Sequence, residues 1–287
     1  MIFIDLHTDM PLKLLENKPS FADCTNCGFE GFLQSAAFWF DGNEANPKEK
    51  YFKLLKATKI FIKEKEAEIF SGKIKAKRSF LLSVENGGFL AEFPDFLEQM
   101  AKDNIKALSL AWNEDNLLAG GCFGKGGLTE KGRDIILKMN ELGICLDISH
   151  LNEKSALEAL NIAKFPLATH SNCKAVLNHK RNLSDEILLK IKEKKGLVGL
   201  CFYPEFLGDN VYYKIRENVE HLCSLGMEEN IAIGSDFDGA KMSEKLSNPK
   251  DIWELYGYLF NMGIKKSVLS RIFYKNAIAF FDRMCQN

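Results

Sequence analysis

The feature that most constrains the fold of this chain is a regular alternation of short apolar runs with amphipathic helical patterns. Most of the apolar runs lack the polar alternation of a half-exposed strand, which is typical of parallel strands covered on both faces. We predict strands at 2–9, 35–40, 79–86, 105–112, 143–149, 165–170, 196–202 and 230–237.

Helical patterns separate these strands. They lie at 48–69, 93–103, 129–142, 153–163, 184–194, 212–225, 249–262 and 265–284. Thr129, Ser184 and Asn248 stand where an N-cap residue accepts a backbone hydrogen bond, and Gly143 follows a helical run as a C-cap glycine does. This alternation continues without a break in composition. It therefore predicts an α/β protein of one domain, residues 1–287, folded as a (β/α)8 TIM barrel rather than an open doubly wound sheet.

The charge balance argues against two classes of partner. Lys and Arg number 38 against 39 Asp and Glu, a net charge of −1, whereas nucleic acids and membrane surfaces attract an excess of positive charge. No apolar run approaches the ~18 residues that a membrane-spanning helix needs. No targeting segment is visible at the N-terminus, so we expect a cytoplasmic protein without nucleic-acid or membrane partners.

A cysteine pair and a glycine-rich loop raise two further possibilities, a structural zinc site and a nucleotide-binding loop. Cys24 and Cys27 have the spacing of a zinc-ligand pair, but no second pair completes a tetrahedral site, so reduced thiols are favoured over a structural zinc. The glycine-rich loop at 120–124 lacks the Lys-Ser/Thr of a phosphate-binding loop, so nucleotide binding is weakly supported.

Ionisable side chains gather at the ends of the predicted strands. Three of the five histidines, His7, His150 and His170, lie at or just past the carboxyl ends of the first, fifth and sixth strands. In a barrel these ends form one edge, where active sites are built from several strands. Carboxylates recur at the same edge, at Asp9, Glu85, Asp236 and Asp238.

This clustering favours a metal site. Charges at buried strand ends are costly unless they are paired or bind a metal. Strand alternation places His7 and Asp9 on one face, so both can reach one ion. Each residue alone fits a structural histidine or a helix cap, but together they favour a shared site. Nitrogen and oxygen ligands of this kind suit Zn²⁺, with Mn²⁺ or Fe²⁺ as alternatives.

The sequence resembles the membrane dipeptidase (renal dipeptidase) family of binuclear zinc peptidases along nearly its whole length. The resemblance lies in Asp5-Leu6-His7-Thr8-Asp9-Met10-Pro11, Ser83-Val84-Glu85-Asn86-Gly87, residues 127–133, Leu146-Asp147-Ile148-Ser149-His150, Thr169-His170-Ser171-Asn172, Lys180-Arg181-Asn182 and Gly234-Ser235-Asp236-Phe237-Asp238-Gly239. It implies a barrel of the metallo-dependent hydrolase type, two zinc ions per chain and hydrolysis of the peptide bond of dipeptides.

The resemblance also implies metal ligands. Carried over by motif, His7 and Asp9 bind one zinc ion, His150 and His170 bind the other, and the carboxylate of Glu85 bridges the two. Two ions held close together lower the pKa of a bridging water, so that a metal-bridging hydroxide exists near neutral pH, and one ion polarises the scissile carbonyl.

Substrate and proton roles follow in the same way. Arg181 would hold the free carboxylate of a dipeptide bidentately, and Asp236 would move the proton from water to the departing amine. Tyr203 is a candidate for the pocket wall, with simple packing as the alternative. Trp112 stands where the animal enzymes have a histidine that contacts the substrate carbonyl. Either Trp112 lines the pocket and Asn113 supplies a hydrogen bond, or Trp112 is a core residue.

Two other functions compete with dipeptide hydrolysis. One is a barrel metallohydrolase acting on another amide, a lactone or a phosphoester, and the other is a non-catalytic metal-binding relative. His7-Thr8-Asp9 differs from the His-x-His with which metal-dependent nucleases and many amidohydrolases open. An inactive descendant has no chemical reason to keep Arg181 and Asp236 beside the ligands. The sequence leaves open which dipeptides are cleaved, whether D residues are accepted and which metal is loaded. Barrels of this kind often pair, which makes a homodimer an expectation to test.

Overall fold

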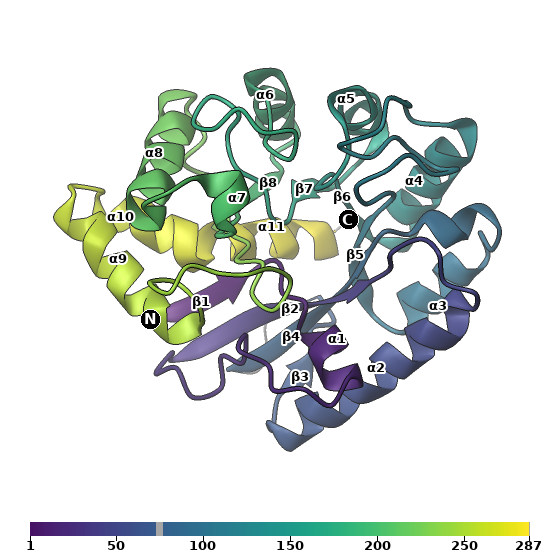
Figure 1. Cartoon of the computed structure of the whole chain (residues 1–287), viewed down its shortest axis with the longest axis horizontal. Coiled ribbons are helices and arrows are strands. Elements are labelled where there is room, and N and C mark those ends of the chain that lie inside the picture. The colour runs from purple at the N-terminus through teal and green to yellow at the C-terminus, as the bar shows by residue number, and fades with distance from the viewer. Residues whose placement is uncertain (73–76, 287) are drawn as a thin grey trace.

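Eight parallel strands form a closed ring in the computed structural model, which describes residues 1–72 and 77–286 (Figure 1). The strands are β1 (Ile2–Asp5), β2 (Gly31–Trp39), β4 (Arg78–Glu85), β5 (Ile105–Ser109), β6 (Cys145–Asp147), β7 (Pro166–Ala168), β8 (Leu197–Leu200) and β9 (Ile231–Ile233). Pairing of β2 with both β1 and β4 closes the ring, and a short ninth strand, β3 (Glu68–Ile69), pairs with β4 from outside it. The predicted (β/α)8 barrel is confirmed.

Helices lie around the ring, and the last of them lies across one of its ends (Figure 1). They are α1 (Met10–Leu15), α2 (Pro47–Glu64), α3 (Phe96–Lys102), α4 (Glu130–Leu142), α5 (Glu153–Ile162), α6 (Asp185–Glu193), α7 (Pro204–Leu207), α8 (Val211–Ser224), α9 (Ile252–Asn261), α10 (Lys266–Ser270) and α11 (Asn276–Cys285). Short 3₁₀ turns lie at Gly88–Ala91 and Pro249–Asp251. Among the described residues, no helix combines the length and the apolar character needed to cross a bilayer.

The predicted helix ends are confirmed where capping residues define them. The side chains of Thr129 and Ser184 accept backbone hydrogen bonds at the starts of α4 and α6, and Asn248 forms a capping box before α9. Gly143 ends α4 in the left-handed region, with φ of 65°. Glycine adopts this conformation without the steric cost of a Cβ atom.

Several predicted boundaries are wrong. The helix predicted at 48–69 ends at Glu64, because Glu66 turns left-handed with φ of 50° and the chain then forms β3. The single helix predicted at 265–284 is α10 and α11 joined by a π-helical segment at Arg271–Lys275. Most strands end earlier than predicted: β1 stops at Asp5, although Thr8 pairs again with Phe237 beyond it. The helices α1 and α7 were not predicted.

The two ends of the barrel have different contents. Successive residues of β1 enter different apolar clusters, Phe3 the large one and Ile4 a smaller one, as strand alternation requires. The smaller cluster includes Cys145 and Leu197, the first residues of β6 and β8, together with Phe280 of α11. Helix α11 therefore closes the amino end of the ring, which leaves the carboxyl end for the polar residues.

Candidate metal centre and active site

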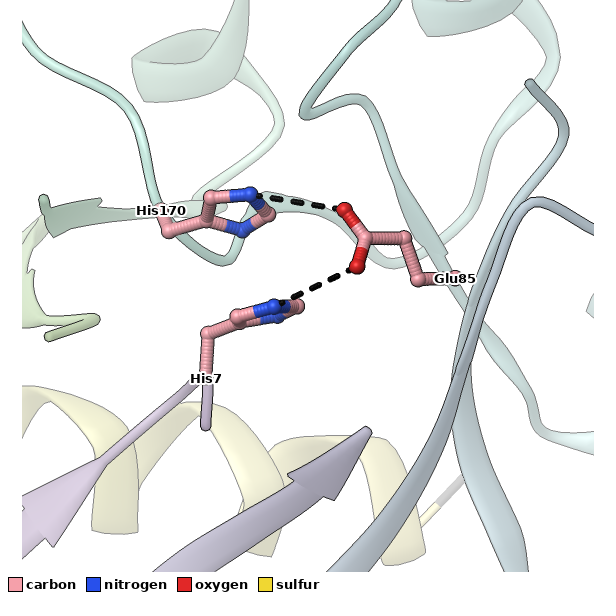
Figure 2. Close-up of side chains that lie close together, drawn as sticks. All are labelled: His7, Glu85 and His170. Carbon is pink, nitrogen blue, oxygen red and sulfur yellow. Dashed lines mark ion pairs between the residues drawn. The ribbon is translucent and has the colours of Figure 1, made fainter. Parts of the chain in front are cut away.

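Glu85 lies beside two histidines that come from other strands, and each of its carboxylate oxygens faces one of them (Figure 2). It is the last residue of β4, whereas His7 and His170 each follow the end of their strand, β1 and β7, by two residues. The Nε2 atom of His7 lies 3.5 Å from Oε2 of Glu85, and Nε2 of His170 lies 3.6 Å from Oε1. One carboxylate therefore presents a different oxygen to each histidine.

The His7 side of Glu85 is rich in carboxylates. Nε2 of His7 lies 3.4 Å from Oδ2 of Asp9 and 4.0 Å from Oδ1 of Asp236. Ligand atoms of these three buried residues all lie within 4.8 Å of one another. A Cβ atom at Gly239 would collide with the carboxylates of Asp9 and Asp236, so a glycine is needed for the chain to pass this close.

The opposite side of Glu85 is formed by two histidines. Nε2 of His150 lies 2.7 Å from Oε1 of Glu85 and 3.0 Å from Nε2 of His170. His150 follows β6 with a positive φ of 70°, an uncommon conformation for a residue with a Cβ atom. The structure thus brings the other four predicted metal ligands, His7, Asp9, His150 and His170, together near the Glu85 carboxylate.

The histidines on the two sides of Glu85 differ in proton affinity. Burial, then the charge of Arg181, lowers the pKa of His150 to about 4, and burial also lowers the pKa of His170. Burial acts on His7 in the same direction, but Glu85 and Asp9 outweigh it and raise the pKa of His7 well above its usual range. His150 and His170 are therefore neutral near pH 7, while the His7 side attracts positive charge.

The arrangement fits bound divalent cations. Nδ1 of His150 lies 3.1 Å from the amide oxygen of Asn113, so it carries the proton and leaves a lone pair on Nε2. That lone pair faces an oxygen of the Glu85 carboxylate, and neither atom carries a proton. The two atoms therefore repel each other, and a cation bound between them removes the repulsion. On the other side, His7 Nε2 and Asp9 Oδ1 are buried and have no hydrogen-bond partner within residues 1–72 and 77–286. Histidine nitrogens and carboxylate oxygens are also the donor types that zinc takes.

Asp236 is held in an environment that favours its protonated form. Burial raises the pKa of its carboxyl to about 8; His7 lowers it, while Asp9 and Glu85 raise it further. Its φ is 66°, and its Oδ2 accepts a hydrogen bond from the Cys201 thiol at 3.7 Å. A carboxyl with this pKa can accept and release a proton near neutral pH.

Asp238, which also ends the last predicted strand, has a structural partner instead. Its carboxylate accepts hydrogen bonds from the Ser20 hydroxyl at 2.6 Å and the Phe21 amide at 3.0 Å. These bonds attach the segment after α1 to the segment after β9. The acidic cluster predicted at this edge therefore divides into residues beside the histidines and a residue that anchors a loop.

Arg181 is buried beside His170 and keeps unused donor capacity. Its side chain is 2% exposed, and Nη2 donates to the backbone oxygen of His170 at 3.1 Å. Nη1 lies 3.5 Å from the Ser171 hydroxyl, and the guanidinium packs over the Phe206 ring. Its Nε has no hydrogen-bond partner among the described residues. The charge of Arg181 is thus placed to attract an anionic group next to the histidines.

The other three residues predicted at the substrate site, Trp112, Asn113 and Tyr203, differ in their surroundings. Trp112 is half-buried, with its ring 5.2 Å from that of Trp39 and 5.9 Å from that of His150, so it lies beside a predicted metal ligand rather than in the core. The amide oxygen of Asn113 is engaged by His150. Tyr203 directs its hydroxyl to Glu205, at an exposed position 2.7 Å away.

Sequence reasoning gave no role to three buried groups that contact the site. They are Asp147 at the end of β6, Thr169 just after β7 and Cys201 just after β8. A carboxylate at a buried strand end was the signal that singled out Asp9, and it applies equally to Asp147. Among the described residues, the two groups that could hold a metal contain neither Cys24 nor Cys27.

The sequence matches the model of the membrane dipeptidase family, Peptidase family M19, over residues 50–286. An uncharacterized dipeptidase of Schizosaccharomyces pombe is 31% identical over 211 residues, which cover 70% of this chain and 52% of that protein. An uncharacterized protein in the pqqA 5′ region of Klebsiella pneumoniae is 31% identical over 206 residues, 66% of this chain and 76% of that protein. This chain thus spans about half the length of the yeast relative.

Solved structures have a similar fold. Dipeptidase AC, a metallopeptidase of family M19, superposes with a TM-score of 0.88 at 22% identity over 100% of this chain and 99% of that one. A metallopeptidase from Rhodobacter sphaeroides, liganded with a phosphinate mimic of the dipeptide L-Ala-D-Ala, gives a TM-score of 0.87 at 21% identity over 99% of both chains. At these identities the likeness concerns the fold.

Proposed function

Because this chain belongs to the membrane dipeptidase family, we propose that it is a zinc-dependent dipeptidase that hydrolyses the peptide bond of dipeptides. The observation that carries the proposal is the position of Glu85, whose two carboxylate oxygens face different histidines across one buried site. A single bridging carboxylate with separate ligands on each side is the arrangement that two neighbouring cations require.

The metal ligands divide at Glu85. His7 and Asp9 would hold one ion, His150 and His170 the other, and Glu85 both. When bound, zinc lowers the pKa of a coordinated water and polarises a carbonyl oxygen. The nitrogen-rich ligand set and the absence of a metal-ligating cysteine among the described residues are consistent with zinc in an open, catalytic site.

Arg181 would bind the carboxylate of the substrate. A planar guanidinium can take a carboxylate through two parallel hydrogen bonds, and Arg181 lies directly beside His170. This fixed charge sets the distance between the substrate's C-terminal carboxylate and its scissile carbonyl. A tripeptide has its carboxylate one residue too far away, so dipeptides are preferred.

Asp236 would transfer the proton. Its Oδ1 faces His7 at 4.0 Å and its Oδ2 is held by the Cys201 thiol, so one carboxylate oxygen is left at the reacting centre. That oxygen takes the proton of the attacking water and gives it to the departing amine nitrogen. In the metal-free protein, burial and the neighbouring carboxylates of Asp9 and Glu85 raise the pKa of Asp236, so its surroundings favour the uptake of a proton.

A small panel of peptides tests the proposal. The purified protein is assayed with L-Ala-L-Ala, L-Ala-D-Ala and L-Ala-L-Ala-L-Ala, before and after removal of metal with a chelator. We expect about two zinc equivalents per chain, cleavage of at least one dipeptide but not of the tripeptide, and loss of activity on chelation that added Zn²⁺ restores. Dipeptide cleavage that is insensitive to chelation would reject the metal mechanism.

A further inference from the structure

We propose that a buried pair, Asp147 and Thr169, fixes the proton position of the histidines on both sides of Glu85. The Thr169 hydroxyl is then a positioning group shared by the two halves of the metal centre. The inference rests on the proposed function only in taking the Nε2 atoms of His7 and His170 as metal ligands.

The side chain of Asp147 accepts three hydrogen bonds. Its Oδ1 accepts hydrogen bonds from the backbone amides of Ser149 at 2.9 Å and Thr169 at 3.0 Å, and its Oδ2 accepts one from the Thr169 hydroxyl at 2.5 Å. Burial raises the pKa of the Asp147 carboxyl, while these bonds, all donated to it, lower it. Three hydrogen bonds donated to one carboxyl group stabilise its ionised form, so Asp147 acts as an acceptor.

The hydroxyl of Thr169 has only one proton to donate to its several neighbours. A threonine hydroxyl has one proton and two lone pairs, and its proton is directed to Asp147. Only lone pairs remain for the histidines, so the Nδ1 atom of His170, 2.8 Å away, must carry a proton and donate it. The Nδ1 atom of His7 lies 3.4 Å from the same hydroxyl and is restricted in the same way, through a longer contact.

A proton held on Nδ1 of a neutral histidine determines the state of the opposite ring nitrogen, Nε2. A neutral imidazole with its proton on Nδ1 has its lone pair on Nε2. In His170 this lone pair faces Oε1 of Glu85, and His7 presents its Nε2 to the other oxygen (Figure 2). The two rings stack with centroids 3.8 Å apart. One hydroxyl therefore orients a ligand in each half of the site, whereas Asn113, among the three histidines, hydrogen-bonds only to His150 in the described part of the chain.

Zinc titration of the metal-free protein with a chromophoric competitor tests this sharing. Groups that orient a ligating histidine change metal affinity by about 10–100-fold when they are removed. We expect Thr169→Val to weaken both zinc ions within this range, with the larger loss on the His170 side, and Asn113→Leu to weaken only one. Thr169→Ser, which keeps the hydroxyl, should bind zinc nearly as the unmodified protein does.

Thr58 supplies the matched control. It is fully buried in α2, and its hydroxyl has no hydrogen-bond partner among the described residues. Thr58→Val therefore makes the same chemical change away from the site and should leave both zinc affinities unchanged. If Thr169→Val binds two zinc ions as tightly as the unmodified protein does, the inference is overturned and the proposed function still stands. A wild-type protein that binds no zinc would overturn the proposed function as well.

A second variant tests the proton position without metal or activity. In Asp147→Asn, the side-chain oxygen still accepts hydrogen bonds from the backbone amides of Ser149 and Thr169. The new NH₂ group therefore takes the place of Oδ2 and donates to the Thr169 hydroxyl. The hydroxyl proton then turns to Nδ1 of His170 and the ring proton moves to Nε2. Long-range ¹H–¹⁵N spectra of the metal-free protein should show His170 protonated on Nδ1 in the wild type and on Nε2 in the variant.

The spectra contain an internal reference. His221, whose Nε2 lies 2.7 Å from Asp185 on the surface, should keep its pattern in both proteins. A role of Asp147 that is merely structural would change stability without moving the His170 proton. An unchanged His170 pattern in the folded Asp147→Asn variant would therefore contradict the inference.

Discussion

The two sides of Glu85 are opposite in charge. On one side His7 lies near the carboxylates of Asp9 and Asp236, and Glu85 and Asp9 raise its pKa. On the other side two neutral histidines lie next to the buried Arg181, whose charge helps to lower their pKa values. This difference supports the division of labour that we propose: proton transfer on the acidic side, and binding of the substrate carboxylate on the basic side.

Removal of the shared group should have the largest effect, because both sides depend on it. Glu85→Gln keeps the shape of the side chain but removes the negative charge between the two ligand sets. We expect zinc content to fall from about two equivalents per chain and kcat to fall at least about a hundredfold. Metal analysis and dipeptide kinetics measure this, and retention of both would show that Glu85 does not bridge.

The acidic side should control turnover. Asp236→Asn removes the group that carries the proton, so kcat is expected to fall by about 10²–10⁴-fold while KM changes little. Zinc content of the variant, measured in parallel, should stay near two equivalents. Loss of one equivalent would instead identify Asp236 as a ligand of the His7 side.

The basic side should control substrate binding. Arg181→Ala removes the positive charge beside His170, and we expect KM to rise by about a hundredfold with a smaller change in kcat. Zinc content should be unchanged. A variant that loses metal but keeps its KM would assign Arg181 a structural role and break the proposed division of labour.

The smallest effect concerns stability of the metal-free protein. The unfolded chain releases the proton of Asp236 near pH 4, whereas the folded state holds it up to about pH 8. The unfolded state therefore binds fewer protons in this window, and the contribution of Asp236 to folding stability falls as pH rises. We expect Asp236→Asn to raise Tm by a few degrees at pH 8 and by nearly nothing below pH 4. Equal Tm values at both pH values would contradict the raised pKa.

The barrel was predictable because its signals are local. Apolar runs, the caps at Thr129 and Ser184 and the glycine at 143 each act within a few residues. The boundaries that failed depend on tertiary contacts: β3 forms only by pairing with β4, and the π-helical segment interrupts a helical pattern that has no sequence break.

The site was predictable only in part. Strand-end position and residue type identified His7, Glu85 and His170, because barrel topology brings such positions together. The role of Thr169 depends on a contact with Asp147, 22 residues away, that no pattern along the chain encodes. Likewise, the hydrogen bond from His150 to Asn113 is visible only in three dimensions.

The central claim is that Glu85 joins two cations, and anomalous diffraction at the zinc edge from zinc-loaded crystals tests it most directly. We predict two peaks, one beside His7 and Asp9 and one beside His150 and His170, each about 2.0–2.2 Å from a different oxygen of Glu85. A single peak, or peaks that do not contact Glu85, would contradict the account.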